Sequence, residues 1–215
     1  EKTTRAMKNK NKNAMFQSIK DSLNKESGSN SSFKDFIKAN QKGKTYKVRL
    51  LPYYENPDNT FFHFFEHGWK SRATGQYQSH LSPSTFEEPD PISETYFRLK
   101  NGTEEEQALA DEHLRRRESW LVNVYVVDDP VTPENNGTVK IWRIGRKLKN
   151  ILSRAIDGDE ADEFGVEKVF DLTDNGATFK IIVEEQGGWP NYDQSKFTTA
   201  IKTDSSEEKA MEIYK

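Results

Sequence analysis

Four short runs of alternating or β-branched residues constrain the fold of this chain more than any other feature. They lie at Thr45 to Leu50, Trp120 to Val127, Thr138 to Ile144 and Phe179 to Val183. Each has the period of a strand with a buried face. The runs are separated by turn-forming residues, which include Pro52, a Pro-Glu-Asn-Asn-Gly connection and Asn175-Gly176. Short strands at irregular spacing predict a mainly β chain and argue against a doubly wound sheet.

Two helices are expected between these strands. Thr103 and Glu106 have the spacing of a capping box, which predicts a helix that ends near Leu114. Apolar residues at helical spacing predict a second helix, with Lys147, Lys149 and Arg154 on its other side; they are Leu148, Ile151, Leu152, Ala155 and Ile156. The fold class is therefore α+β, a small antiparallel barrel with inserted helices.

The segment 53–97 holds 11 aromatic residues in 45 positions. Its four prolines predict mostly loop and short strand, so we expect an aromatic-rich lobe inserted in the core. We place this inserted subdomain at residues 60–114, within a core domain that covers residues 33–215.

Charge is divided unevenly along the chain. Residues 1–50 hold 13 lysines and arginines against four acidic residues, a net of +9, and the remainder has a net of −12. Residues 1–13 are too polar to form a core. The spacing of Phe16, Ile19 and Leu23 predicts one short amphipathic helix, and a Ser-rich linker follows it. We therefore expect residues 1–32 to form a basic arm that meets a polyanion or an acidic protein, unless the arm is only a solvated tail.

Several function classes are excluded by what the sequence lacks. The chain has no cysteine, which excludes disulfides, thiol nucleophiles and thiolate metal sites. No apolar stretch is long enough for a membrane span, and residues 1–20 have no signal-peptide core, so we expect a soluble, unexported protein. There is no HExxH, GxSxG or Walker A motif. We expect no catalytic residues and no cofactor.

One acidic cluster leaves an enzymatic alternative open. Its carboxylates are crowded enough to suggest a metal-dependent nuclease, although they lack the spacing of an EF-hand and are typical of a solvated loop. They are Asp157, Asp159, Glu160, Asp162 and Glu163.

Three clusters combine cations with aromatic rings, as a groove for single-stranded nucleic acid requires. The first is Arg115, Arg116 and Arg117 with Trp120; the second is Lys140, Trp142, Arg146 and Lys147; the third is Trp189, Tyr192 and Lys196. Guanidinium and ammonium groups pair with phosphates, and indole rings stack on bases. The alternative for each tryptophan is burial in the core.

Several stretches resemble the single-stranded DNA-binding proteins of T4-type phages. The resemblance is carried by Ser119 to Gly137, with its Asp-Pro-x-x-Pro-Glu-Asn-x-Gly loop, by Trp142 to Lys147 and by Gly188 to Phe197. Val48 to Pro52 and His67 to Trp69 agree as well. It implies an OB-fold core that binds single-stranded DNA cooperatively in phage replication, recombination and repair, in the cytoplasm of an infected bacterium. An RNA-binding translational regulator on the same barrel is the alternative.

The resemblance also implies roles for individual residues. Arg49 and Arg116 match nucleic-acid contacts, Trp120, Trp142 and Trp189 match aromatic residues of the binding cleft, and Tyr192 matches directly. Lys2, Thr3, Thr4 and Arg5 are similar to a motif that binds the neighbouring protomer, so self-association along DNA is expected, together with phage replication and recombination proteins as partners.

The family's zinc ligands correspond here to His67, Leu81, Asp90 and Ser93. Only the histidine is retained, so we expect no metal and a lobe held together by its aromatic side chains. A histidine–carboxylate site of His67, His80 and Asp90 is the minor alternative.

Overall fold

The computed structural model describes residues 32–199 and 212–213. The chain divides into two compact units, Glu1–Phe36 and Ile37–Lys215. Of the first unit, the described part is the 3-10 helix η2 (Ser32–Asp35) and the first residue of β1 (Phe36–Ile37). The expected amphipathic helix at residues 16–23, the Ser-rich linker and the motif at residues 2–5 lie outside the described residues.

An antiparallel sheet forms the second unit. Its path runs β6-β5-β2-β7-β8, while β3 pairs with β5 and β4, and β9 pairs with β7. The strands are β2 (Lys44–Leu51), β3 (Phe62–Lys70), β4 (Tyr77–Leu81), β5 (Arg117–Asp128), β6 (Val139–Ile144), β7 (Thr178–Gln186), β8 (Trp189–Asn191) and β9 (Lys196–Thr198). The α+β class is confirmed, and these ladders follow an open path.

Short helices connect the strands. They are η3 (Pro57–Asn59), η4 (Pro83–Phe86), α2 (Pro91–Lys100), α3 (Glu104–His113), η5 (Pro133–Asn135), α4 (Arg146–Asp157) and α5 (Gly165–Val169). Within the described part of the chain, none of these helices has the length and apolar character needed to cross a bilayer.

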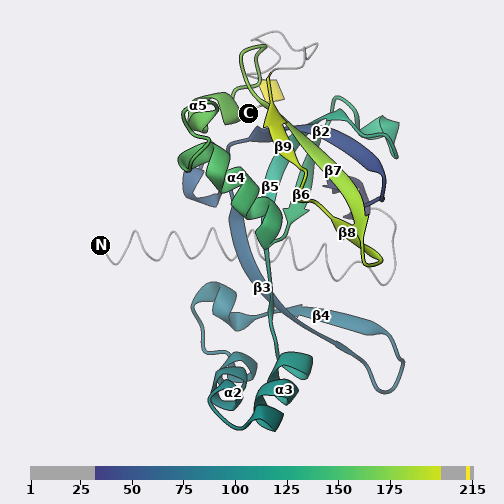
Figure 1. Ribbon diagram of the computed structural model, residues 1–215, viewed down its shortest axis with the longest axis vertical. Helices are drawn as coiled ribbons and strands as arrows, with labels where there is room; N and C mark the ends of the chain where they lie inside the picture. Colours follow the sequence, from purple (N-terminus) through teal and green to yellow (C-terminus); the bar gives the residue numbers. More distant parts are fainter. Residues whose placement is uncertain (1–31, 200–211, 214–215) are drawn as a thin grey trace. The chain divides into compact units, whose positions relative to one another are not determined.

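The main core lies between the sheet and α4, which packs against β5 and β6 (Figure 1). Alternate residues of β2 and β5, such as Val48, Leu50 and Val124, are fully buried there. Leu148, Leu152 and Ala155 of α4 join them, as the spacing of apolar residues predicts.

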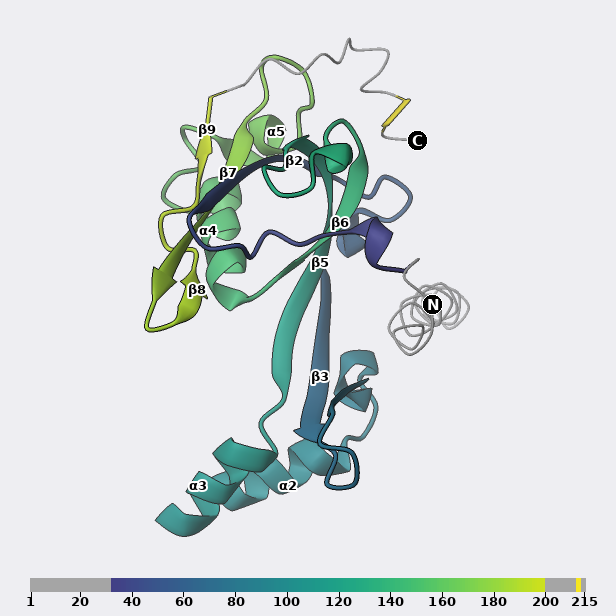
Figure 2. The ribbon, with the colours of Figure 1, turned by 90° about the vertical axis from the view of Figure 1, so that its right-hand side faces the viewer.

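β3 and β5 run side by side away from this core to a lobe made of β4, η4, α2 and α3 (Figure 2). At their shared ladder His63 pairs with Trp120 and Phe65 with Glu118. Side chains directly opposite each other point to the same face, so this ladder places aromatic and charged groups together.

Most of the expected elements are confirmed. The capping box of Thr103 and Glu106 is present at α3, and all four predicted strands are found, with β5 starting at Arg117. The expectation of loop and short strand across residues 53–97 is wrong at β3, which has nine residues, and at α2. The α2 signal is local, because Asp90 caps the helix and Pro91 occupies its first turn.

Candidate nucleic-acid interface

A row of three rings with a cation at each end follows the ladder between β3 and β5. The guanidinium carbon of Arg116 lies 3.8 Å from the centre of the Phe65 ring, and the centre of the Phe65 ring lies 4.6 Å from that of His63. His63 stacks on Trp120 at 4.7 Å with only 9° between the planes, and Lys149 Nζ is 6.0 Å from the Trp120 ring. We call these five residues the aromatic–cation row.

Glu118 joins this row to the start of α4. Its Oε1 lies 2.9 Å from His63 Nε2, and Arg146 donates from Nε to Oε2 at 2.9 Å. Burial raises the pKa of the Glu118 carboxyl, but hydrogen bonds from Arg146 and His63 outweigh burial and hold it below its usual range. The carboxylate therefore stays charged and engages both the His63 ring and the Arg146 guanidinium group.

Lys147, the second residue of α4, connects this helix to the segment that follows the β7–β8 hairpin. Lys147 Nζ lies 2.9 Å from Asp193 Oδ1, and Asn191 Nδ2 also donates to Asp193 at 2.9 Å. The hairpin turns through Gly187 and Gly188, both with positive φ, and carries Trp189 with 76% of its surface exposed. The ion pair between Lys147 and Asp193 thus brings the second predicted cluster beside the third.

The three consecutive arginines do not form one cluster, because their side chains have different partners. Arg116 lies over Phe65, whereas Arg117 lies 5.0 Å from the Tyr77 ring and donates to Ser79 Oγ at 3.0 Å. Arg115 is exposed beside a small hollow between α2 and β5.

Arg49 and Trp142 are buried, which corrects the expectation that they present their side chains to nucleic acid. Arg49 is 0% exposed and its Nη1 donates to the carbonyls of Asp171 and Thr173 at 3.0 and 3.2 Å. A Cβ on Gly176 would overlap the backbone carbonyl oxygen of Asp171 and lie 2.6 Å from the same Nη1, so this turn needs glycine. Trp142 is 2% exposed and packs on Phe179.

Trp120 is 8% exposed, and one face of its indole is covered by His63. The expected open platform at this position is therefore closed in this structure, and the outward ring of the stack is His63.

The remaining predicted residues occupy the surrounding surface. Tyr192 is half-buried and donates to the Ala39 carbonyl at 3.1 Å, while Lys196 is exposed on β9. Lys140 is half-buried on β6.

Residues at the family's metal positions do not fit a metal in this chain. Leu81 offers no ligand atom, and Asp90 already accepts several hydrogen bonds. His80, a member of the alternative histidine–carboxylate site, stacks on Trp69 with 5.2 Å between the ring centres. In the described ranges no group of three histidine or acidic side chains is arranged to hold a metal ion.

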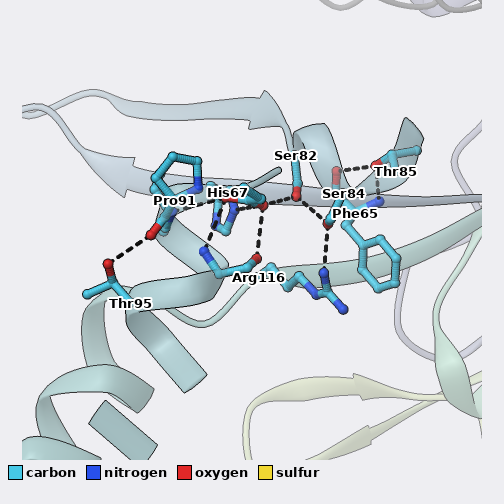
Figure 3. A network of polar contacts seen from close by, with 11 residues as sticks. Phe65, His67, Ser82, Ser84, Thr85, Pro91, Thr95 and Arg116 are labelled. Carbon is cyan, nitrogen blue, oxygen red and sulfur yellow. Dashed lines mark hydrogen bonds and ion pairs between the residues drawn. The ribbon is translucent and has the colours of Figure 1, made fainter. Parts of the chain in front are cut away.

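A buried polar network lies at these positions instead (Figure 3). His67 Nε2 lies 2.8 Å from Asp90 Oδ2, Ser93 donates to the same oxygen at 2.9 Å, and Ser82 also donates to it. Burial raises the pKa of Asp90, but these donors outweigh it and hold the pKa well below its usual range. The network adds a polar contribution to the lobe beside the aromatic side chains that the sequence predicts.

The acidic cluster that left an enzymatic alternative open is engaged by a neighbouring cation. Arg154 forms ion pairs with Asp159 and Glu160, the first at 3.1 Å.

Sequence reasoning missed His63, Phe65, Glu118 and Lys149 as members of this surface. A signal was present for two of them, because Phe61, His63 and Phe65 alternate with the period of a strand. The role of Glu118 depends on the register between β3 and β5, which the sequence does not specify.

Comparison with known proteins identifies the family of this chain. Residues 41–215 match the model of a family described as gp32 DNA binding protein like. The chain belongs to this gp32-like family. It is 30% identical over 152 residues to the single-stranded DNA-binding proteins of Enterobacteria phages T4 and T2, which covers 70% of this chain and 49% of each relative. The chain thus spans about half the length of the gp32-like relatives that it matches.

Proposed function

We propose that this chain binds single-stranded DNA without sequence preference, with the aromatic–cation row and the first turn of α4 as the contact surface. The observation that carries the proposal is the connected series of contacts from Arg116 through Glu118 to Asp193, in a chain of the gp32-like family. Cations pair with phosphates and rings stack on bases, and neither contact depends on base identity. Both named relatives are single-stranded DNA-binding proteins, which supports DNA as the ligand.

For the architecture we propose an OB-fold barrel, supported by the antiparallel order of the strands and by α4 against β5 and β6. For the whole protein we propose cooperative assembly along the strand through residues 1–32, including Lys2 to Arg5. It would act in phage replication, recombination and repair in the cytoplasm of the infected host, together with other phage replication and recombination proteins.

Titration with an oligo-dT strand tests the proposal, with tryptophan fluorescence as the readout. Trp189 is the most exposed of the four tryptophans, at 76% against 44% for Trp69, so we expect quenching that decreases in Trp189→Phe, while the anisotropy of a labelled strand still reports binding by that variant. An RNA oligomer of matched length is the comparison. Tighter binding to RNA would support the translational regulator, and no binding to oligo-dT would overturn the proposal.

A further inference from the structure

The network around Asp90 joins three parts of the lobe and is almost wholly buried. His67 comes from β3, Ser82 follows β4, and Asp90 caps α2; their exposed fractions are 5%, 0% and 4%. Oδ1 of Asp90 accepts the backbone N–H groups of Ile92 and Ser93 at 3.1 Å, while Oδ2 accepts the side chains.

The hydroxyl groups of this network have a fixed direction. A serine hydroxyl carries one proton, and Ser82 donates its proton to Asp90. Ser84 Oγ lies 2.6 Å from Ser82 Oγ and must therefore be the donor of that pair. The oxygen of Ser84 then accepts from Arg116 Nη1, also at 2.6 Å (Figure 3).

Arg116 is consequently held at two places. Its guanidinium group donates into a chain of two hydroxyls that ends on a buried carboxylate, and it lies over the Phe65 ring at 3.8 Å. Hydrogen bonds in such a chain polarise one another, so the negative charge of Asp90 acts on Arg116 through Ser82 and Ser84. A guanidinium group that is already oriented loses less conformational freedom when it binds a phosphate.

We propose that Ser84 is a positioning residue for single-stranded DNA binding, which fixes Arg116 through the network of Ser82 and Asp90. This proposal rests on the proposed function of the chain. The lobe would then contribute to DNA binding as well as to its own stability, because the buried Asp90 carboxylate orients Arg116 of the aromatic–cation row. Asp90 matches a zinc-ligand position of the family, and in this chain its carboxylate accepts the hydrogen bonds that orient Arg116.

The test compares Ser84→Ala with Ser84→Thr on a short oligo-dT strand that holds one protomer. Ser84→Ala is expected to lower the affinity three- to ten-fold and to make the dependence of log K on log salt shallower by up to about 0.7, the value of one phosphate contact on a single strand. Ser84→Thr keeps the hydroxyl and should restore both. Thr95→Ala removes a hydroxyl from the same lobe that bonds only the Pro91 carbonyl, at 2.8 Å, and should change neither.

A double-mutant cycle separates positioning from simple destabilisation. If Ser84 acts through Arg116, Ser84→Ala should cost nothing further in an Arg116→Ala background. Ser82→Ala, which breaks the next link, should behave like Ser84→Ala, so the proposal does not depend on one variant folding. Equal affinity of Ser84→Ala and the unchanged protein, or an equal loss in both backgrounds, would overturn the proposal. Failure of the unchanged protein to bind oligo-dT would instead overturn the proposed function.

Discussion

Glu118 is the only acidic side chain of the β3–β5 ladder that faces the aromatic–cation row among the described residues, and it holds His63 and Arg146. Both partners must leave this carboxylate before a phosphate can bind them. The carboxylate therefore competes with DNA for the same donors, since an arginine that forms an ion pair with a carboxylate must give it up to meet a phosphate.

Removing the charge of Glu118 should strengthen binding. In Glu118→Gln we expect higher affinity for oligo-dT and a salt dependence steeper by about 0.7 for each new phosphate contact. Glu112→Gln on exposed α3 makes the same change in net charge at a residue whose ion-pair partner is His113 and not a member of the row, and it serves as the control. If the two variants bind equally well, the competition does not exist.

The tryptophans should separate into two classes. Trp189→Ala is expected to weaken binding by about 1–3 kcal/mol with an unchanged melting temperature, because the indole is exposed and free to stack. Trp142→Ala should instead lower the free energy of unfolding by about 3–5 kcal/mol, since it leaves a cavity in the core. Oligo-dT titration and thermal melting of both variants check this. A selective loss of affinity in Trp142→Ala, without destabilisation, would contradict the assignment.

At the scale of elements, the sequence predicted the strands and helices that carry a regular period. β2, β6, β7, α3 and α4 all follow from alternation, helical spacing or a capping box. α2 was missed because its exposed aromatic and charged residues lack a clean apolar stripe, although Asp90 and Pro91 mark its start. The correspondence to zinc ligands placed His67, Asp90 and Ser93 together, but the link from Ser82 through Ser84 to Arg116 has no sequence pattern, because η4 brings it to Asp90.

The candidate site was predicted in its residue types and less well in its geometry. Arg116, Arg146 and Lys147 do lie along one connected series of contacts, but Arg49 and Trp142 turn inward. Burial of a long cation such as Arg49 depends on distant loop carbonyls, which no local pattern reveals. The same limit applies to Trp120, whose indole is covered by a residue of another strand.

The lobe should be independent of metal. Its buried centre is a hydrogen-bonded carboxylate, so a strong chelator should leave the melting temperature unchanged, whereas a structural zinc ion would contribute several kcal/mol to folding. Thermal melting with and without chelator and elemental analysis of the purified protein provide the measurement. Stoichiometric zinc would show that the lobe does hold a metal ion.

At the scale of the whole molecule, residues 51–215 have a net charge of −12, so phosphates must bind to a local group of cations. Binding that neutralises about four to six phosphates should give a slope of log K against log salt of roughly −3 to −4 on single strands. Titrations of oligo-dT at several salt concentrations measure this slope. A slope near zero would show that phosphate contacts do not contribute.

The basic N-terminal segment offers the last test, because its net charge admits two modes of action. A segment with a net of +9 over residues 1–50 can add phosphate contacts, or it can bind the acidic surface of the next protomer, where residues 51–215 have a net of −12. If the segment binds phosphates, its deletion should weaken binding even to a strand that holds one protomer. The salt slope should then become shallower by about 0.7 for each phosphate that the segment neutralises.

Contact between protomers would leave that intrinsic affinity nearly unchanged after the deletion and abolish tight assembly on long strands, because each protomer would then bind alone. We expect the second result, since the acidic balance of residues 51–215 favours a protein partner for the basic segment. Deletion of residues 1–25, with binding measured on a one-protomer strand and on a long strand, decides between the modes. Equal losses of affinity on both strands would show that the segment binds DNA directly and does not mediate cooperativity.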